Sequence, residues 1–346
     1  MKRILVTGGL GFIGSHLTEA LLSQGHEVHI VDDMRADTMR QLRLFDEWRL
    51  SGVPIHKLAF SPCKVVEFNP PAPQFDQIYH LASPVGPAGV LKQAGMIAGQ
   101  IVADIYHLMA LAQTCKAKLL FVSTSEVYGG GQQGLCREDM PCIIQANTTA
   151  RLEYALGKLA AECALRNSGQ KAVIIRPFNV AGPRQSPKGG FVLPRFIEQA
   201  RSNIPLTVFE SGEQIRAFTH VRDIVNGLIL AMDKGGAGQV YNLGNPLNRT
   251  TILQLAKTVQ RVVNPDAPIS HTDGKAIYGA TYAEAADKYP DATKAMQELD
   301  WQPTLLIEDI VRDTLAEYQR RDDLPAKTVM EVSIEMNPEG SVKATA

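Results

Sequence analysis

The first half of the chain alternates short apolar runs with longer segments of helical periodicity, and this alternation restricts the fold more than any other feature. Each run suits a buried strand, and each segment between runs is long enough for a crossover helix. Strands joined in this way lie parallel, with helices on both faces of the sheet. The runs are RILVTG (3–8), EVHIVDD (27–33), KVVEF (64–68), QIYHLAS (77–83), KLLFVST (118–124) and KAVIIRP (171–177). We therefore predict an α/β fold with a doubly wound parallel sheet of the Rossmann type.

A change of texture after Pro177 predicts a second, smaller lobe. Prolines and glycines break the following segment into short pieces, and 346 residues exceed the usual size of one domain core. The expected division is a dinucleotide-binding domain (1–180, with 218–248 returning to it, QVYNLG at 239–244 as a strand), an α/β substrate lobe (181–217 and 249–322) and a tail (323–346).

The charge balance argues against nucleic acid or an anionic membrane as a partner. Thirty-five basic and 36 acidic residues give a formal net charge of -1. No apolar run approaches the roughly 20 residues of a membrane helix, and no signal peptide precedes the first strand. The five cysteines form no CxxC pair, and the eight histidines show no metal-ligand spacing. We expect a cytoplasmic protein with reduced thiols and no metal.

The segment TGGLGFIG (7–14) follows the first strand and opens the first helix. Gly8, Gly11 and Gly14 allow a tight turn in which backbone N–H groups and the helix N-terminus approach a diphosphate. The second strand ends in Asp32, whose carboxylate would accept hydrogen bonds from ribose hydroxyls and repel a 2′-phosphate. This pattern predicts NAD as the cofactor, although Arg35 leaves NADP as an alternative.

A second pattern predicts the reacting end of the site. Tyr154 and Lys158 lie four residues apart and share a helix face, and Thr124 ends a hydroxyl-rich strand. To oxidise a sugar alcohol, a base must take the hydroxyl proton as hydride leaves carbon. The pKa of a tyrosine, near 10, must fall by about three units for this role. That change corresponds to a preference for the phenolate of about 4 kcal/mol. The Lys158 ammonium and the positive nicotinamide are expected to supply this, while Thr124 donates a hydrogen bond.

Together these patterns resemble the extended branch of the short-chain dehydrogenase/reductase superfamily. Further segments resemble its NAD-dependent sugar-nucleotide epimerases, dehydratases and decarboxylases, most of all the UDP-glucuronate decarboxylase (UDP-xylose synthase) group. They are HLASP (80–84), STSEVYG (123–129), RPFNVAGPR (176–184), PLTVF (205–209), QIRAFTHVRDIVNGL (214–228) and NLGNP (242–246). The resemblance implies an enzyme acting on a UDP-sugar and a homodimer formed through 97–116 and 151–167.

The resemblance also implies site residues. For the cofactor these are Phe12, Ile13, Leu81, Ala82 and Ser83, beside the glycines, Asp32, Tyr154 and Lys158. For the substrate they are Ser125, Arg151, Asn179, Thr207, Phe209, Arg216 and Lys288. The arginine side chain matches phosphate oxygens, and an aromatic ring suits the face of a base.

Several reactions of this family pass through the same C4 ketone intermediate, and the residue at the position of Glu126 helps to tell them apart. Related 4,6-dehydratases follow the threonine with Asp-Glu, whereas Thr124-Ser125-Glu126 resembles the decarboxylases, in which the glutamate manages protons near C5. The alternatives are a 4-epimerase acting on UDP-glucuronate or a UDP-hexose, and a NAD-binding sensor without catalysis. Lys288 replaces the arginine of an RKPD-type segment, and Lys64 replaces an aspartate, so a divergent member of the family is expected.

Overall fold

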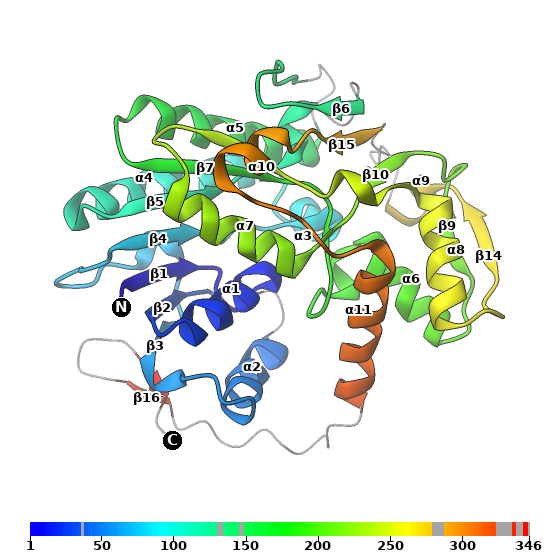
Figure 1. Ribbon diagram of the computed structural model, residues 1–346, viewed down its shortest axis with the longest axis horizontal. Helices are drawn as coiled ribbons and strands as arrows, with labels where there is room; N and C mark the ends of the chain where they lie inside the picture. Colours follow the sequence, from blue (N-terminus) through cyan, green and yellow to red (C-terminus); the bar gives the residue numbers. More distant parts are fainter. Residues whose placement is uncertain are drawn as a thin grey trace.

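The computed structural model describes residues 1–35, 38–129, 134–144, 149–278, 287–322, 334–336 and 342–344. Across these residues the central feature is a sheet of seven parallel strands with an antiparallel hairpin at one edge (Figure 1). In spatial order the strands are β12 (Val240–Leu243), β7 (Ala172–Pro177), β5 (Lys118–Val122), β4 (Gln77–His80), β1 (Arg3–Thr7), β2 (Glu27–Val31), β3 (Leu58–Ser61), β17 (Val342–Ala344) and β16 (Ile334–Met336). This arrangement confirms the predicted Rossmann-type fold class.

One predicted strand is wrong. Residues 65–67 of the KVVEF run form the short 3-10 helix η2 (Val65–Glu67), and β3 lies earlier, over Leu58–Ser61. The backbone N–H of Lys64 donates to Glu67 Oε2 at 3.1 Å, which closes η2 as a turn. Of the two valines only Val65 is buried, whereas Val66 is 39% exposed. Adjacent valines without alternation therefore gave a false strand signal, whereas Leu58 and Phe60 alternate into the core.

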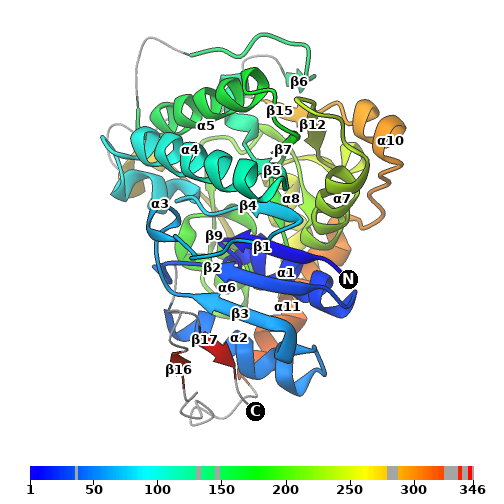
Figure 2. The same cartoon turned by 90° about the vertical axis from the view of Figure 1, so that its left-hand side faces the viewer.

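Helices cover both faces of the sheet (Figure 2). One face carries α1 (Phe12–Ser23), α2 (Thr38–Leu50), α7 (Val221–Lys234) and α10 (Thr293–Leu299). The other carries α3 (Gly86–Lys92), α4 (Ile97–Cys115) and α5 (Ala150–Asn167). Since β1, β4, β5, β7 and β12 are buried on both sides, these strands are nearly continuous apolar runs. None of the helices in the described parts of the chain is long and apolar enough to cross a membrane.

A separate apolar core lies in a second lobe, at the right of Figure 1. This lobe contains α6 (Val192–Arg201), β9 (Leu206–Phe209), α8 (Ile252–Val263), β14 (Ile269–Thr272), α9 (Gly274–Tyr278) and α11 (Ile307–Asp322). A four-stranded sheet joins distant segments in the order β13 (Arg249–Thr251), β10 (Ile215–Ala217), β15 (Lys288–Pro290) and β6 (Gly134–Cys136). A short pair links β8 (Val180–Ala181) to β11 (Thr219–His220), and further 3-10 turns are η1 (Ile55–Lys57), η3 (Ser125–Tyr128), η4 (Pro187–Gly189) and η5 (Pro246–Asn248).

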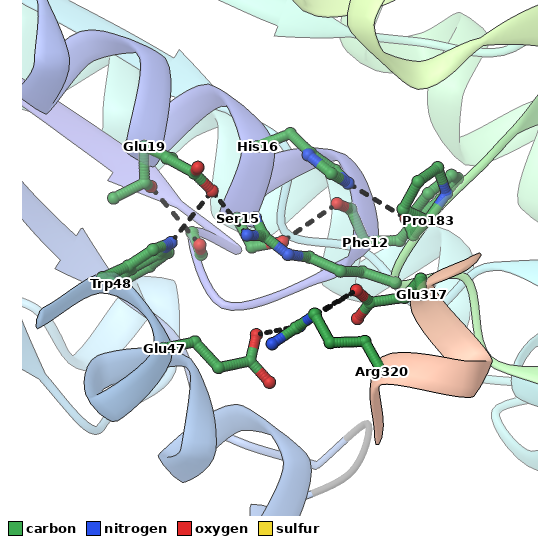
Figure 3. Close-up of polar contacts among 12 residues, drawn as sticks. Phe12, Ser15, His16, Glu19, Glu47, Trp48, Pro183, Glu317 and Arg320 are labelled. Carbon is green, nitrogen blue, oxygen red and sulfur yellow. Dashed lines mark hydrogen bonds and ion pairs between the residues drawn. The ribbon is translucent and has the colours of Figure 1, made fainter. Parts of the chain in front are cut away.

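Helix α1 connects the sheet to the segment that enters this lobe (Figure 3). The His16 ring lies 2.9 Å from the carbonyl oxygen of Pro183. Glu19 accepts hydrogen bonds from Trp48 Nε1 at 3.2 Å and from Arg184 Nη2 at 2.5 Å. A single carboxylate thus joins α1 to α2 and to the lobe, so the start of α1 is positioned from three directions.

The last long helix reaches back to the same region. Arg320 on α11 pairs with Glu47 on α2 at 3.1 Å and with Glu317 at 2.9 Å, and Figure 3 shows its side chain between the two acids. Beyond α11, β17 pairs antiparallel with β3, Val342 opposite Phe60. Most of the expected tail (323–346) lies outside the described residues, but β16 and β17 extend the main sheet.

Candidate active site

The glycine loop makes a tight backbone cradle at the start of α1. Gly8 has φ +71°, and a Cβ there would lie 2.8 Å from the backbone nitrogen of Ala82. A Cβ on Gly14 would collide with the carbonyl oxygen of Gly8. The Gly11 N–H donates to that same oxygen at 3.0 Å, and α1 begins one residue later, at Phe12. Only glycine fits at positions 8 and 14, and the cradle suits a diphosphate at a helix N-terminus.

Asp32 lies at the end of β2, beside this loop. Its carboxylate accepts hydrogen bonds from the backbone N–H groups of Leu10 at 3.1 Å and Met34 at 2.9 Å. Burial raises the pKa of Asp32 above its usual range, and these hydrogen bonds oppose the change. Arg35 pairs with Asp33 at 3.0 Å. The Asp32 carboxylate is therefore held in place at the end of the site where the cofactor is expected. Arg35 is paired with a different carboxylate, that of Asp33.

The end of β4 connects the glycine loop to the reacting groups. The N–H of Leu81 donates to the Thr7 carbonyl at 3.1 Å, and the N–H of Ala82 donates to Thr7 Oγ1 at 3.3 Å. The next residue, Ser83, hydrogen-bonds the side chain of Tyr154. One short segment thus touches the cradle at its start and the tyrosine at its end.

Four side chains predicted for catalysis and cofactor binding come together where β4, β5 and α5 meet. Buried Tyr154 hydrogen-bonds the side chains of Thr124 and Ser83. Lys158, one turn along α5, is 2% exposed and donates from Nζ to the Val122 carbonyl at 2.8 Å. Its Nζ lies 5.8 Å from the centre of the Tyr154 ring. The structure thus places the hydroxyl, phenol and amine groups in one buried site.

The protein groups around Tyr154 raise its pKa on balance. Burial raises this pKa, the Glu126 charge raises it further, and the hydrogen bonds to Thr124 and Ser83 only partly compensate. Burial also lowers the pKa of Lys158 to about 7, so its ammonium is itself hard to maintain. The positive charge of a bound nicotinamide is therefore needed before the phenolate becomes accessible.

Glu126 is held by two cations. Arg151 donates from Nε at 2.5 Å, and Lys288 forms an ion pair with the other carboxylate oxygen. Burial would raise the pKa of Glu126, but the Lys288 and Arg151 charges outweigh it and hold this pKa well below its usual range. The Lys288 side chain is 3% exposed, and its β15 position is in register with Arg216 on β10. Glu126 is thus a stable carboxylate within a cationic group.

Apart from Ser125, the other predicted substrate residues lie in the second lobe or at its entrance. Asn179, with φ +32°, accepts from the N–H of Thr219 at 3.1 Å. Thr207 Oγ1 accepts from Gln199 Nε2 at 3.0 Å. The Arg195 guanidinium lies 4.2 Å from the centre of the Phe209 ring. Arg195 was not predicted from the sequence, which offered no signal for a stacking partner fourteen positions upstream after a proline-rich segment. Ser125 is buried at the start of η3, between Thr124 and Glu126.

A buried charge network beneath the site was also missed. Arg176 donates to Glu162 at 3.0 and 2.6 Å and to the Tyr128 hydroxyl at 2.9 Å. Tyr128 donates to Asn242 at 2.8 Å, and Ser123 donates to Glu162. Two signals were present in the sequence: an arginine ending the apolar AVII run, and an acid four residues after Lys158 on the same helix face.

No metal centre emerges from the residues that the structure places: no group of three or more His, Cys, Asp or Glu side chains among them could hold an ion. The sequence and the cradle instead point to an organic cofactor, and comparisons with known proteins agree.

Residues 4–244 match the model of the NAD dependent epimerase/dehydratase family. UDP-glucuronic acid decarboxylase 1 of Xenopus tropicalis is 32% identical over 330 residues, covering 92% of this chain and 72% of that protein. UDP-N-acetyl-alpha-D-glucosaminuronate decarboxylase of Bacillus cytotoxicus is 30% identical, covering 91% of this chain and 97% of that protein.

The structure is similar to UDP-glucuronic acid 4-epimerase from Bacillus cereus, solved in complex with UDP-glucuronic acid and NAD. The TM-score is 0.77 at 25% identity, covering 92% of this chain and 99% of the epimerase. The matched family region includes both the glycine loop and the Tyr154 helix. The chain therefore belongs to the NAD dependent epimerase/dehydratase family, as an enzyme with NAD as its cofactor.

Proposed function

We propose that the enzyme oxidises C4 of UDP-glucuronate and then releases C6 as carbon dioxide, giving UDP-xylose. The observation that carries this proposal is the Glu126 carboxylate. It is held between Arg151 and Lys288 and is close enough to Tyr154 for its charge to act on the phenol. Similarity to decarboxylases of two uronic-acid sugar nucleotides supports it.

The residues of the cradle fit NAD. The cofactor would be held by Gly8, Gly11, Phe12, Ile13 and Gly14 at its diphosphate, by Asp32 at a ribose, and by Leu81, Ala82, Ser83, Tyr154 and Lys158 toward the nicotinamide. When bound, NAD would supply the hydride acceptor for the oxidation of C4 and the hydride for its later reduction. The engagement of Arg35 by Asp33 supports NAD over NADP.

Tyr154 is the base in the first step. Its phenolate takes the proton of the C4 hydroxyl, and Thr124 and Ser83 stabilise the phenolate oxygen through the hydrogen bonds that they already make. The Lys158 ammonium, which donates to the Val122 carbonyl, supplies positive charge that favours the phenolate. Each group is buried, so the attraction between these charges is stronger than it would be in water.

The second step follows from the position of the ketone. The C6 carboxylate of a uronate is β to C4, so the electrons of the C5–C6 bond can move into the ketone as carbon dioxide leaves. C5 then takes a proton from water. Because its two cations keep Glu126 ionised, we assign it the role of accepting a hydrogen bond from this water and orienting it, rather than of donating its own proton.

The charge of the site fits an anionic substrate. Arg151 and Lys288 pair with the single carboxylate of Glu126, and Arg216 on β10 is in register with Lys288. We assign Lys288 and Arg151 to the uronate and Arg216 to the diphosphate. Of the remaining predicted residues, Asn179 and Ser125 would contact the sugar and diphosphate, and Thr207 and Phe209 in the lobe of 181–217 and 249–322 would border the base.

The alternative is a UDP-sugar 4-epimerase, favoured by the likeness to the Bacillus cereus enzyme. Both reactions share the first step and differ in whether C6 is retained. We also propose a homodimer through α4 and α5, where Tyr106 is 58% and Leu156 is 45% exposed. Size-exclusion chromatography with light scattering tests this state, and a monomer at micromolar concentration would contradict it.

The deciding experiment incubates the purified protein with UDP-glucuronate and NAD and resolves the products by mass spectrometry and NMR. Loss of carbon dioxide with a pentose product supports decarboxylation. An unchanged mass with inverted C4 contradicts it and establishes epimerisation. Tyr154→Phe is the matched control, because it removes the base but leaves the ring, and it should abolish either product.

A further inference from the structure

The turn that carries Glu126 is bonded on both sides to one buried ion pair. Ser123, just before η3, donates to Glu162. Tyr128, the last residue of η3, accepts from Arg176 Nη1 at 2.9 Å. The Arg176 and Glu162 side chains are almost fully buried and share two hydrogen bonds, at 3.0 and 2.6 Å. The chain on either side of Glu126 is therefore fixed to the interior of the protein.

The strand that carries Lys288 is held by a buried amide. Asn242 on β12 has no exposed surface. Its Nδ2 donates to the carbonyl of Cys136 on β6 at 3.0 Å and to that of Asp291, just beyond β15, at 3.3 Å. Strands β6 and β15 pair with each other, with Pro290 opposite Cys136. One amide group thus fixes the end of β15 and the strand beside it.

The hydroxyl of Tyr128 joins these two parts. It donates to Asn242 Oδ1 at 2.8 Å, so the Asn242 side chain accepts one hydrogen bond and donates two. The same turn and the same strand meet again at the ion pair between Glu126 and Lys288. The contacts therefore form a closed ring, with the buried hydroxyl–amide bond at one junction and the ion pair at the other.

We propose that Tyr128 and Asn242 are positioning residues: their hydrogen bond sets the separation between the turn of Glu126 and the strand of Lys288, and thereby the place where these two groups meet a uronate. The ion pair alone does not fix this separation, because a lysine is a point charge on a flexible side chain. A fully satisfied buried network is directional and favours a single arrangement. The proposal rests on the proposed function for the roles of Glu126 and Lys288.

Both positioning side chains are closed off from solvent: Tyr128 is 1% and Asn242 is 0% exposed. Their effect on the reaction must therefore pass through the groups that they contact. A purely structural role would predict lost stability only, so the test needs a readout that follows the uronate.

The test compares two variants that each remove one buried hydroxyl. Tyr128→Phe keeps the ring, whose centre lies 6.1 Å from that of Phe178. The matched control is Tyr241→Phe. Tyr241 precedes Asn242 on β12, is also 1% exposed and donates to Glu298 at 2.8 Å. Because successive strand residues face opposite sides of the sheet, the control removes its hydroxyl from the other side of the same strand. Both variants should lower Tm by a similar amount, about 1–4 °C.

Kinetics and binding on the NAD-loaded enzyme separate the two roles. With UDP-glucuronate, we expect Tyr128→Phe to lower kcat/KM about ten- to a hundredfold, because a small displacement of reacting groups is costly. Its affinity for UDP, measured by calorimetric titration, should stay within about twofold of wild type, because UDP lacks the uronate. Tyr241→Phe should leave both quantities within about twofold of wild type.

A second measurement needs no substrate. Lys288→Met breaks the ion pair, so the Tyr128 hydroxyl then has no separation to maintain. The loss of Tm caused by Tyr128→Phe should therefore be smaller in the Lys288→Met background than in wild type, by at least about 1 °C. The loss caused by Tyr241→Phe should be the same in both backgrounds.

Four outcomes would overturn the proposal: an unchanged kcat/KM in Tyr128→Phe, an equal loss in Tyr241→Phe, a parallel loss of UDP affinity, or losses of Tm in Tyr128→Phe and Lys288→Met that simply add. A failure of the proposed function would instead appear in the wild-type enzyme, as UDP-glucuronate left unconverted. The Tm comparison would still decide whether Tyr128 maintains the arrangement of Glu126 and Lys288.

Discussion

The buried pair between Arg176 and Glu162 gives the sharpest stability prediction. Both side chains are at most 3% exposed, and Glu162 accepts two hydrogen bonds from Arg176 and one from Ser123. Glu162→Gln keeps the shape of the side chain but leaves the guanidinium without a counter-charge. Breaking a buried pair in this way costs about 3–5 kcal/mol.

The expected loss converts to a change in melting temperature. At about 2.1 cal/mol/K per residue, the unfolding entropy of 346 residues is about 0.7 kcal/mol/K. A loss of about 4 kcal/mol therefore lowers Tm by about 5 °C. Differential scanning calorimetry at neutral pH measures this. Arg137→Gln is the control, because its partner Asp139 and Arg137 itself are more than half exposed, and Tm should change by about 1 °C or less.

A double variant tests the reasoning itself. If the penalty comes from an uncompensated charge, adding Arg176→Met to Glu162→Gln should recover most of the lost stability, because an apolar replacement of a buried pair is often nearly neutral. Tyr128 keeps its bond to Asn242 in that variant. The explanation is refuted if Glu162→Gln melts within about 1 °C of wild type, or if the two losses simply add.

Three further predictions concern the site. Gly14→Ala should weaken NAD binding at least about tenfold by calorimetric titration, because its Cβ collides with the Gly8 carbonyl; unchanged affinity would contradict the cradle. Lys288→Met should lower kcat/KM for UDP-glucuronate about ten- to a hundredfold, since a charge-assisted hydrogen bond is worth about 1.5–3 kcal/mol, and should raise the pKa of Glu126 toward its usual value. Asp32→Ala should reduce the preference for NAD over NADP in paired binding titrations, and an unaltered ratio would remove Asp32 from the ribose site.

The sequence predicted the elements whose signals are local. The predicted strands at 3–8, 27–33, 77–83, 118–124 and 171–177 each contain a strand of the sheet, because their apolar runs are bounded by turn residues. The error at 64–68 arose because periodicity cannot separate two adjacent valines in a turn from a short buried strand. The family and its cofactor were likewise predictable, since glycines, tyrosine and lysine act at fixed short spacings.

The sequence by itself thus determined the cradle at Gly8 and Gly14 and the shared helix face of Tyr154 and Lys158, because backbone geometry over a few residues sets both. Only the tertiary structure decided which charges meet. Lys288 reaches Glu126 across 162 positions. Burial and long-range partners then set the protonation of each group, and neither is written in local spacing.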